Sequence, residues 1–278
     1  MEYKEDHNEE RWDALARKGV LCSQPKLELT PDQAKDYVNR NHRYGESLAG
    51  KNVLCLASGG GQQSIGFALL GARVTVVDFS EKQLEKDKLV AEKYAKEIRL
   101  VKADMRNLSF LNNEEFHIVY QPYSLNYVSS VGQVFDEVVR VLKPEGVYDL
   151  MFHNPYAHGT WKDGCWGSQW TVDELWEGRG YPVWQPYQDG YPIKTSDPAW
   201  NFIDEEGKYV SVDSPQEYRH TMSTIINGLI NRGLEMISYA EEAGNDFDSE
   251  PGTWEHYKSC LPPWIYILWR KKKINRPF

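Results

Sequence analysis

Short apolar runs alternate with amphipathic stretches between residues 51 and 152. The first run stops in glycines, which is typical of a buried strand that enters a turn. The predicted strands are Asn52–Leu56, Arg73–Val77, Ile98–Lys102, Phe116–Tyr120 and Val147–Phe152. The predicted helices between them are Gln63–Leu70, Ser80–Ala95 and Val131–Leu142. Strands that alternate with helices at this spacing predict a parallel sheet with right-handed crossovers and helices on both faces.

Capping residues support two of the helices. Ser80 is placed as an N-cap, and Gln83 three residues later would complete a capping box. Thr30 precedes Pro31, and proline is favoured at the first position of a helix, which here is predicted over residues 32–41.

The segments before and after this core differ from it in composition and pattern. Residues 1–48 predict a helical extension, with a further helix over residues 9–18, and residues 49–152 form the core itself. Residues 153–212 are rich in Gly and Pro and hold six of the ten tryptophans, which predicts an aromatic cap inserted after the fifth strand. Residues 213–278 predict a helix from Ser214 to Arg232 and then two strands, Leu234–Ala240 and Trp264–Trp269. The pattern predicts a single α/β domain over residues 1–278, with a seven-stranded, mostly parallel sheet whose last strand is antiparallel.

Charge and composition narrow the possible partners. The net charge of -9 leaves no broad basic surface for phosphates, so nucleic acid is not an expected partner. The four cysteines are far apart, and the seven histidines show no metal-ligand spacing, so we expect neither a disulfide framework nor a metal. The first residues lack the apolar segment of a signal peptide, and no stretch has the length of a membrane span. We therefore expect a cytoplasmic protein that has no membrane partner.

The strongest chemical signal is the turn from Ala57 to Gln63, which reads Ala-Ser-Gly-Gly-Gly-Gln-Gln. Glycines let the backbone pass close to a ligand at the carboxyl end of a strand. Asp78 ends the next strand, where a carboxylate can accept hydrogen bonds from both hydroxyls of a ribose. Strand, turn, helix, strand and acid in this order predict a nucleoside site.

These motifs resemble those of class I S-adenosylmethionine-dependent methyltransferases, and the resemblance covers most of the chain from Lys51 onward. The glycine spacing reads Gly59, Gly61 and Ser64, Asp104 ends the third strand, and a turn at residues 143–146 precedes the fifth strand. Leu54–Gln63, Asp78, Ser80, Gln83-Leu84 and Tyr218–Thr221 together resemble a little-characterised bacterial subgroup of these enzymes. Cys55 and Ala57 depart from the family, which usually has an acid and a glycine there. The resemblance implies a Rossmann-like fold and S-adenosylmethionine as cofactor, with S-adenosylhomocysteine as product.

The resemblance also implies which residues contact the cofactor: Ala57, Ser58, Gly59, Gly61, Gln62, Gln63, Asp78, Phe79, Ser80, Asp104, Met105, Gln121, Tyr123 and Tyr127. The family reaction is an in-line attack on the sulfonium methyl group, so the protein mainly aligns donor and acceptor. The expected acceptor is a small molecule that is methylated on nitrogen or oxygen, because an enclosed aromatic cap suits a compact ligand.

The catalytic residue is left open, with His153, Tyr123 and His220 as candidates for the acceptor side. A histidine there can accept a proton near neutral pH, but each histidine can also be a packing residue. Gln121-Pro122-Tyr123 only partly resembles the motif of amino-methylating relatives. Trp12 is a candidate for closing over the cofactor. Trp161, Trp166 and Trp170 are interpreted either as a wall that faces the substrate or as buried filler of a long loop.

Two other functions stay open at this point. An NAD-dependent oxidoreductase would share the glycine turn and the ribose-binding acid, although Ser64, Asp104 and the antiparallel C-terminal strands argue against it. A methyltransferase-like protein that binds the cofactor without turnover is the second, suggested by Cys55 and Ala57.

Overall fold

The structure is a computed structural model that describes residues 6–19, 23–157, 186–193, 202–203, 209–210, 215–251 and 253–273. The helices are α1 Asp6–Lys18, α2 Pro31–Val38, η2 Arg40–His42, α3 Gln63–Leu69, α4 Glu81–Lys93, η3 Ser124–Tyr127, α5 Gly132–Val141, α6 Met222–Ile230 and α7 Trp254–Cys260. The strands are β1 Asn52–Leu56, β2 Arg73–Asp78, β3 Ile98–Lys102, β4 Phe116–Pro122, β5 Leu142–His153, β6 Tyr191–Ile193, β7 Phe202–Ile203, β8 Tyr209–Val210, β9 Glu217–Arg219, β10 Leu234–Glu241 and β11 Trp264–Lys271.

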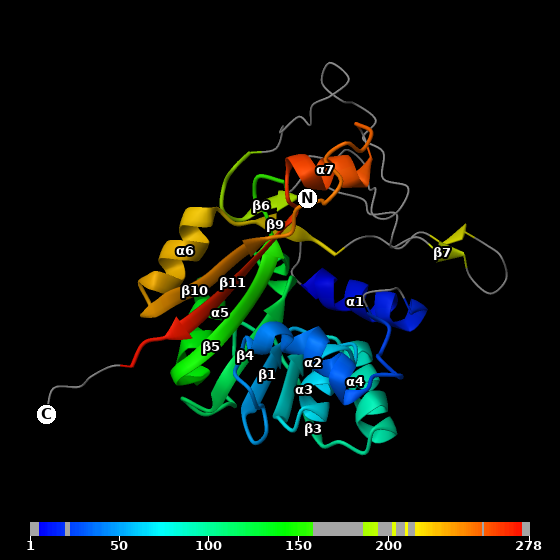
Figure 1. Ribbon diagram of the computed structural model, residues 1–278, viewed down its shortest axis with the longest axis vertical. Coiled ribbons are helices and arrows are strands. Elements are labelled where there is room, and N and C mark those ends of the chain that lie inside the picture. Colours follow the sequence, from blue (N-terminus) through cyan, green and yellow to red (C-terminus); the bar gives the residue numbers. More distant parts are fainter. Residues whose placement is uncertain are drawn as a thin grey trace, which may run out of the picture.

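Seven strands form one sheet in the order β10-β11-β5-β4-β1-β2-β3. Strands β1 to β5 are parallel, and β11 is antiparallel to both β5 and β10. The predicted seven-stranded, mostly parallel sheet with an antiparallel last strand is therefore confirmed. Figure 1 shows α1 and the small β6–β9 sheet near the end of the molecule where the parallel strands finish.

Alternating side chains of the strands divide the core into two layers. On one face, Leu54, Leu56 and Val119 pack with residues of α5 and α6. On the other, Val53 and Cys55 pack with residues of α2, α3 and α4. This alternation, with helices over both faces, is what a buried parallel sheet requires.

The predicted core elements agree closely with the structure. Strands β1 and β3 have the predicted bounds, and β2 and β4 extend one and two residues further than predicted. Strand β5 begins earlier, at Leu142, because Leu142 pairs with Phe116 before a register shift brings Val147 opposite Ile118. The predicted turn at residues 143–146 is thus an irregularity inside a strand.

Two predictions in the helices need correction. The helix predicted from Ser214 begins only at Met222, with Thr221 as its N-cap, because Glu217–Arg219 pairs with Tyr191–Ile193 as strand β9. A pairing partner so far away in the sequence leaves no local signal.

The second correction concerns the start of α4. Ser80 accepts a hydrogen bond from the Gln83 amide at 3.2 Å, as predicted. The side-chain oxygen of Gln83 has no partner among the described residues, so the reciprocal half of the capping box is not formed. Helix α7 was not predicted, although Thr253 caps it.

Most of the predicted aromatic cap, including Trp161, Trp166 and Trp170, lies outside the described residues. Within the described part of the chain, no helix is long and apolar enough to cross a bilayer.

Candidate cofactor and acceptor site

The strand order reverses beside β1. From β1 the chain builds outward through β2 and β3, then returns to place β4 on the other side of β1. In open α/β sheets ligands bind at such a switch point, outside the carboxyl ends of the strands. The turn from β1 to α3 and the segment after β4 therefore border the expected site.

The glycine turn is built against the acid that ends β2. The amide of Gly59 donates to Asp78 Oδ2 at 2.8 Å. A Cβ on Gly59 would lie 2.7 Å from the Cβ of Gln83 and 3.0 Å from Asp78 Oδ2, so no side chain fits there. Gly61 has a φ of +68°, and a Cβ on it would lie 2.7 Å from the Lys86 carbonyl oxygen. The glycines are thus required for the close packing of turn, acid and α4.

Asp78 is buried and held by backbone amides. Its Oδ1 accepts from the Ser80 amide at 2.9 Å, in addition to the bond from Gly59. Burial raises the pKa of Asp78 to about 6, even though the hydrogen bonds from Ser80, Gly59 and Phe79 favour the charged form. A carboxylate that the environment disfavours, placed at the edge of the switch point, is typical of a site that a ligand completes.

A second buried acid, Asp87, was missed by the sequence reasoning. It lies on the buried face of α4 and accepts hydrogen bonds from the Gly60 amide at 2.8 Å and from the Ser64 hydroxyl. Burial raises its pKa to about 7, against the effect of those hydrogen bonds. The sequence signal that could have found Asp87 was an acidic residue on the otherwise apolar face of a predicted helix. Asp87 fixes the middle of the turn and explains why Ser64 stands where dinucleotide-binding proteins have a third glycine.

The other predicted turn residues are held by local hydrogen bonds. The side-chain amide of Gln62 donates to the Gln24 carbonyl at 2.9 Å. The Gln63 side chain lies 3.3 Å from the hydroxyls of both Ser58 and Tyr37. Ala57 has a φ of 45° at the point where the chain leaves β1. Alanine, at a position where the family usually has glycine, therefore adopts a left-handed backbone conformation.

Three further predicted cofactor residues differ in how much of their side chains is already engaged. The hydroxyl of Ser80 donates to Asp13 on α1 at 2.6 Å, while Phe79 is half-buried. Asp104 accepts from the Arg106 Nε at 3.0 Å. Burial alone would raise the pKa of Asp104, but the bonds from Arg106 outweigh burial and lower it.

Met105 and Gln121 are bound to each other inside the protein. The side-chain Nε2 of Gln121 donates to the Met105 sulfur at 3.2 Å, and the side-chain Oε1 accepts from the Tyr148 hydroxyl at 2.6 Å. Because Gln121 is fully buried, its side chain supports the segment after β4 from below.

Aromatic rings form a row along the carboxyl ends of β4 and β5. Trp12 of α1 meets Tyr127 edge-on at 5.4 Å between ring centroids, and Tyr127 meets Tyr123 at 5.9 Å. Tyr123 in turn lies 6.2 Å from the ring of His153, which is buried. The structure thus brings together two of the three catalytic candidates and places Trp12 beside them.

His220 occupies a different environment from the one predicted. It follows β9 instead of lying on a helix, and its Nε2 is 2.9 Å from the Val128 carbonyl oxygen. Burial lowers the pKa of His220. A carbonyl can only accept, so Nε2 carries a proton and donates it to the backbone, as in a packing histidine.

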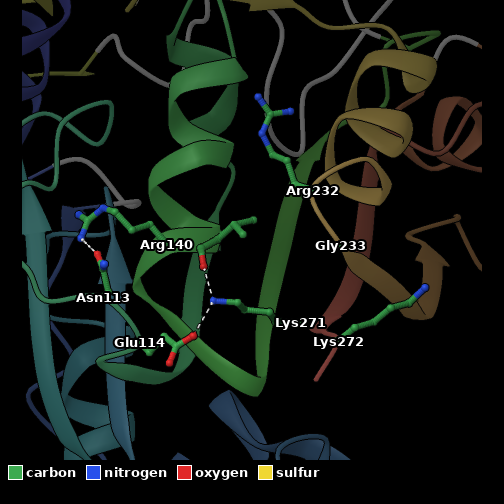
Figure 2. A pocket seen from close by; sticks show the side chains of 8 residues that line it. Asn113, Glu114, Arg140, Arg232, Gly233, Lys271 and Lys272 are labelled. Carbon is green, nitrogen blue, oxygen red and sulfur yellow. Dashed lines mark hydrogen bonds and ion pairs between the residues drawn. The ribbon is translucent and has the colours of Figure 1, made fainter. Parts of the chain in front are cut away.

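A hollow of about 640 Å³ lies at the opposite end of the sheet, where the parallel strands begin. Figure 2 shows the Arg140 guanidinium joined to Asn113 and the Lys271 ammonium held between Glu114 and a backbone carbonyl. Arg140 and Lys271 therefore connect neighbouring segments of the protein through these bonds. The hollow is therefore structural and separate from the switch point.

The residues at the switch point fit a nucleoside. A carboxylate offers about four acceptor positions, and backbone amides of three residues already use some of those of Asp78, which leaves capacity for a ribose hydroxyl. Helix α1 connects the aromatic row to this part of the site, because its Trp12 meets Tyr127 and its Asp13 accepts from the Ser80 hydroxyl, two residues after Asp78. The fold and the site together define an α/β protein that binds a nucleoside cofactor.

Comparison with known proteins identifies the class. Residues 54–149 match a family model described as a methyltransferase domain. An "uncharacterized methyltransferase YbaJ" of Bacillus subtilis (strain 168) is 30% identical over 254 residues, which cover 86% of this chain and 90% of that protein. A ubiquinone biosynthesis O-methyltransferase of Dechloromonas aromatica (strain RCB) is 36% identical over 100 residues, covering 36% of this chain and 43% of that protein.

Among solved structures, a putative S-adenosylmethionine-dependent methyltransferase from Listeria monocytogenes superimposes with a TM-score of 0.57 at 20% identity, covering 82% of this chain and 93% of that chain. The chain belongs to the class I S-adenosylmethionine-dependent methyltransferases. It is an enzyme whose cofactor is S-adenosylmethionine. The prediction of a methyltransferase is confirmed over the two alternatives, the NAD-dependent oxidoreductase and the protein without turnover.

Proposed function

We propose that the enzyme methylates an oxygen or a nitrogen of a small organic acceptor, which binds over Tyr123, Tyr127 and His153. The observation that carries this proposal is the row of rings that ends in a buried imidazole at the carboxyl ends of β4 and β5. Flat aromatic walls with one polar group at the end suit a compact organic molecule. The acidic protein surface supports the same choice over nucleic acid.

We assign the cofactor to the turn and the strand ends beside this row. Asp78 accepts the ribose hydroxyls, with Phe79 and Ser80 behind it. Residues Ala57, Ser58, Gly59, Gly61, Gln62 and Gln63 surround the methionine part. Asp104 and Met105 lie beside the adenine, and Tyr123 and Tyr127 border the transferred methyl group, with Gln121 buried beneath their segment.

The chemistry needs little from the protein beyond placement. Bound S-adenosylmethionine supplies a methyl group that its sulfonium charge has already activated. The residues of the turn fix the cofactor, and the ring row fixes the acceptor in line with it. Helix α1 covers the site from the side: Asn8 donates to the Tyr127 carbonyl at 3.2 Å and accepts from the Gln216 amide at 2.6 Å. Such cover excludes water from the reacting groups.

Calorimetry with S-adenosylmethionine, S-adenosylhomocysteine and NAD tests the cofactor assignment, followed by a screen of small hydroxyl and amine compounds for S-adenosylhomocysteine production. We expect micromolar binding of the first two ligands and none of NAD. Asp78→Ala should weaken S-adenosylhomocysteine binding by about 1–3 kcal/mol, because ribose hydroxyls lose a charged partner. Unchanged affinity would refute the ribose assignment. Turnover of a polymer alone, with no small compound methylated, would refute the acceptor class.

A further inference from the structure

Glu217 lies in the acceptor side of the site but outside the residues that match the methyltransferase domain. It begins β9, and its backbone pairs with Ile193 of β6. The Tyr123 hydroxyl donates to Glu217 Oε2 at 3.0 Å. Glu217 is half-buried, and this burial raises its pKa to about 7, while the charge of His153 and the bond from Tyr123 act in the opposite direction. Among the described residues, these are the two titratable groups that act on Glu217.

The orientation of His153 follows from its neighbours. Its Nδ1 lies 3.1 Å from the Asn154 carbonyl oxygen, and its own amide donates to Asn126 Oδ1 at 3.0 Å. A carbonyl oxygen only accepts, so Nδ1 carries the proton in the neutral ring. The lone pair is therefore on Nε2, which is buried.

Three segments thus bring a carboxyl, a phenol and an imidazole together. Tyr123 precedes η3, His153 ends β5, and Glu217 begins β9. The arrangement resembles other acid–histidine pairs. In such pairs the histidine accepts the substrate's proton, and the carboxylate stabilises the protonated ring.

We propose that Glu217 is a positioning residue that makes His153 the general base of the reaction, so that the acceptor is an O–H or N–H compound that loses its proton on methylation. This inference rests on the proposed function. The acceptor's oxygen or nitrogen forms a bond to the methyl carbon, and the bond from that carbon to sulfur breaks, with its electron pair left on sulfur. The acceptor's proton passes to His153 Nε2. The carboxylate of Glu217 stabilises the imidazolium, and the Tyr123 hydroxyl holds the carboxylate in place.

The test needs no knowledge of the acceptor. Protein labelled with ¹³C in the Glu carboxyl groups and ¹⁵N in the His rings is loaded with S-adenosylhomocysteine and titrated by NMR, and Glu217→Gln and His153→Gln assign the two signals. We expect Glu217 to titrate near pH 7. His153→Gln and Tyr123→Phe should each shift that titration to higher pH. Glu217→Gln should lower the proton affinity of His153 about tenfold, because the negative charge that interacts with the ring is lost.

His117→Gln is the matched control, since His117 lies on the same strand as Pro122 but at its amino end. It should leave the Glu217 titration unchanged. An ordinary carboxyl titration of Glu217, or one that His153→Gln and Tyr123→Phe do not move, overturns the inference. Calorimetry with S-adenosylhomocysteine on the same samples and the acceptor screen separate this result from a failure of the proposed function, because only the latter abolishes cofactor binding in the wild type or leaves every small compound unmethylated.

Once the screen provides an acceptor, steady-state kinetics give a second test of the role of Glu217. His153→Gln should lower kcat by about 10²-fold or more, the usual size of a general-base contribution. Glu217→Gln should lower kcat by up to about tenfold, in line with the tenfold loss of proton affinity at His153, with the KM for S-adenosylmethionine unchanged. Equal losses in kcat at all pH values, together with a raised KM for the cofactor, would show a structural role and overturn the inference.

Discussion

Replacing Asp78 by Asn should make the cofactor-free enzyme more stable and its cofactor binding weaker. Asp78 is 6% exposed, and burial raises its pKa from 3.8 to about 6. The folded protein therefore binds the proton of this carboxyl more tightly than the unfolded chain does. Above pH 6 the ionised side chain opposes folding by about 3 kcal/mol, at about 1.4 kcal/mol for each unit of pKa.

Asparagine removes the charge but supplies only one acceptor oxygen. Gly59 and Ser80 each donate to a different oxygen of Asp78, at 2.8 and 2.9 Å, so one of these amides would face the NH₂ group. The lost bond costs about 1–2 kcal/mol. The net expected change is a gain of about 1–2 kcal/mol, or about 2–8 °C in Tm for a chain of this size. Binding of S-adenosylhomocysteine should weaken about tenfold to a hundredfold.

Urea unfolding of the cofactor-free protein between pH 4 and pH 8, with calorimetry on the same samples, measures both changes. The stability advantage of Asp78→Asn should be absent near pH 4, where the wild-type carboxyl is protonated in the folded protein and still about half protonated in the unfolded chain. It should grow between about pH 4 and pH 6 and level off above pH 6. Glu137→Gln is the matched control. Hydrogen bonds from Arg140 and the Leu108 amide lower the pKa of Glu137, so this variant should lose about 1–2 kcal/mol and bind the cofactor normally.

A loss of stability in Asp78→Asn at pH 8, or an unchanged affinity for S-adenosylhomocysteine, would refute the reasoning. Either result would mean that Asp78 serves the architecture of the turn and not the ligand.

Three further predictions concern the same site. Gly61→Ala should lower the free energy of unfolding by about 2–4 kcal/mol, because it combines a positive φ with a Cβ 2.7 Å from a carbonyl of α4. Gly233→Ala, with a φ of 85° and no atom within 4 Å of the added Cβ, should lower it by about 1 kcal/mol. Denaturant unfolding compares the two variants, and equal losses would contradict the packing argument. Affinity for S-adenosylhomocysteine should fall as the pH is lowered through 6, because ribose hydroxyls favour the ionised form of Asp78; a flat profile in calorimetry would count against that contact. Trp12→Ala should weaken cofactor binding about tenfold through loss of its packing on Tyr127, with little effect on the stability of the sheet, and a normal dissociation constant would remove α1 from the site.

The sequence by itself determined the parallel core and the cofactor turn. Apolar runs and caps are local features, and β1 and β3 were predicted to the residue for that reason. The glycine turn and Asp78 could be paired because the carboxyl ends of neighbouring parallel strands lie at the same edge of a sheet. The spacing between them along the chain is enough to fix their proximity.

Only the tertiary structure decided the acceptor side. The strand β9 depends on pairing with β6, so a local reading took its residues for the start of a helix. Tyr123 and Glu217 are in contact although 94 positions separate them, and no periodicity in the chain records that contact. Asp87 likewise became part of the turn only when α4 packed against it. Local patterns specify which elements form, whereas the close packing of distant segments decides which polar groups meet between them.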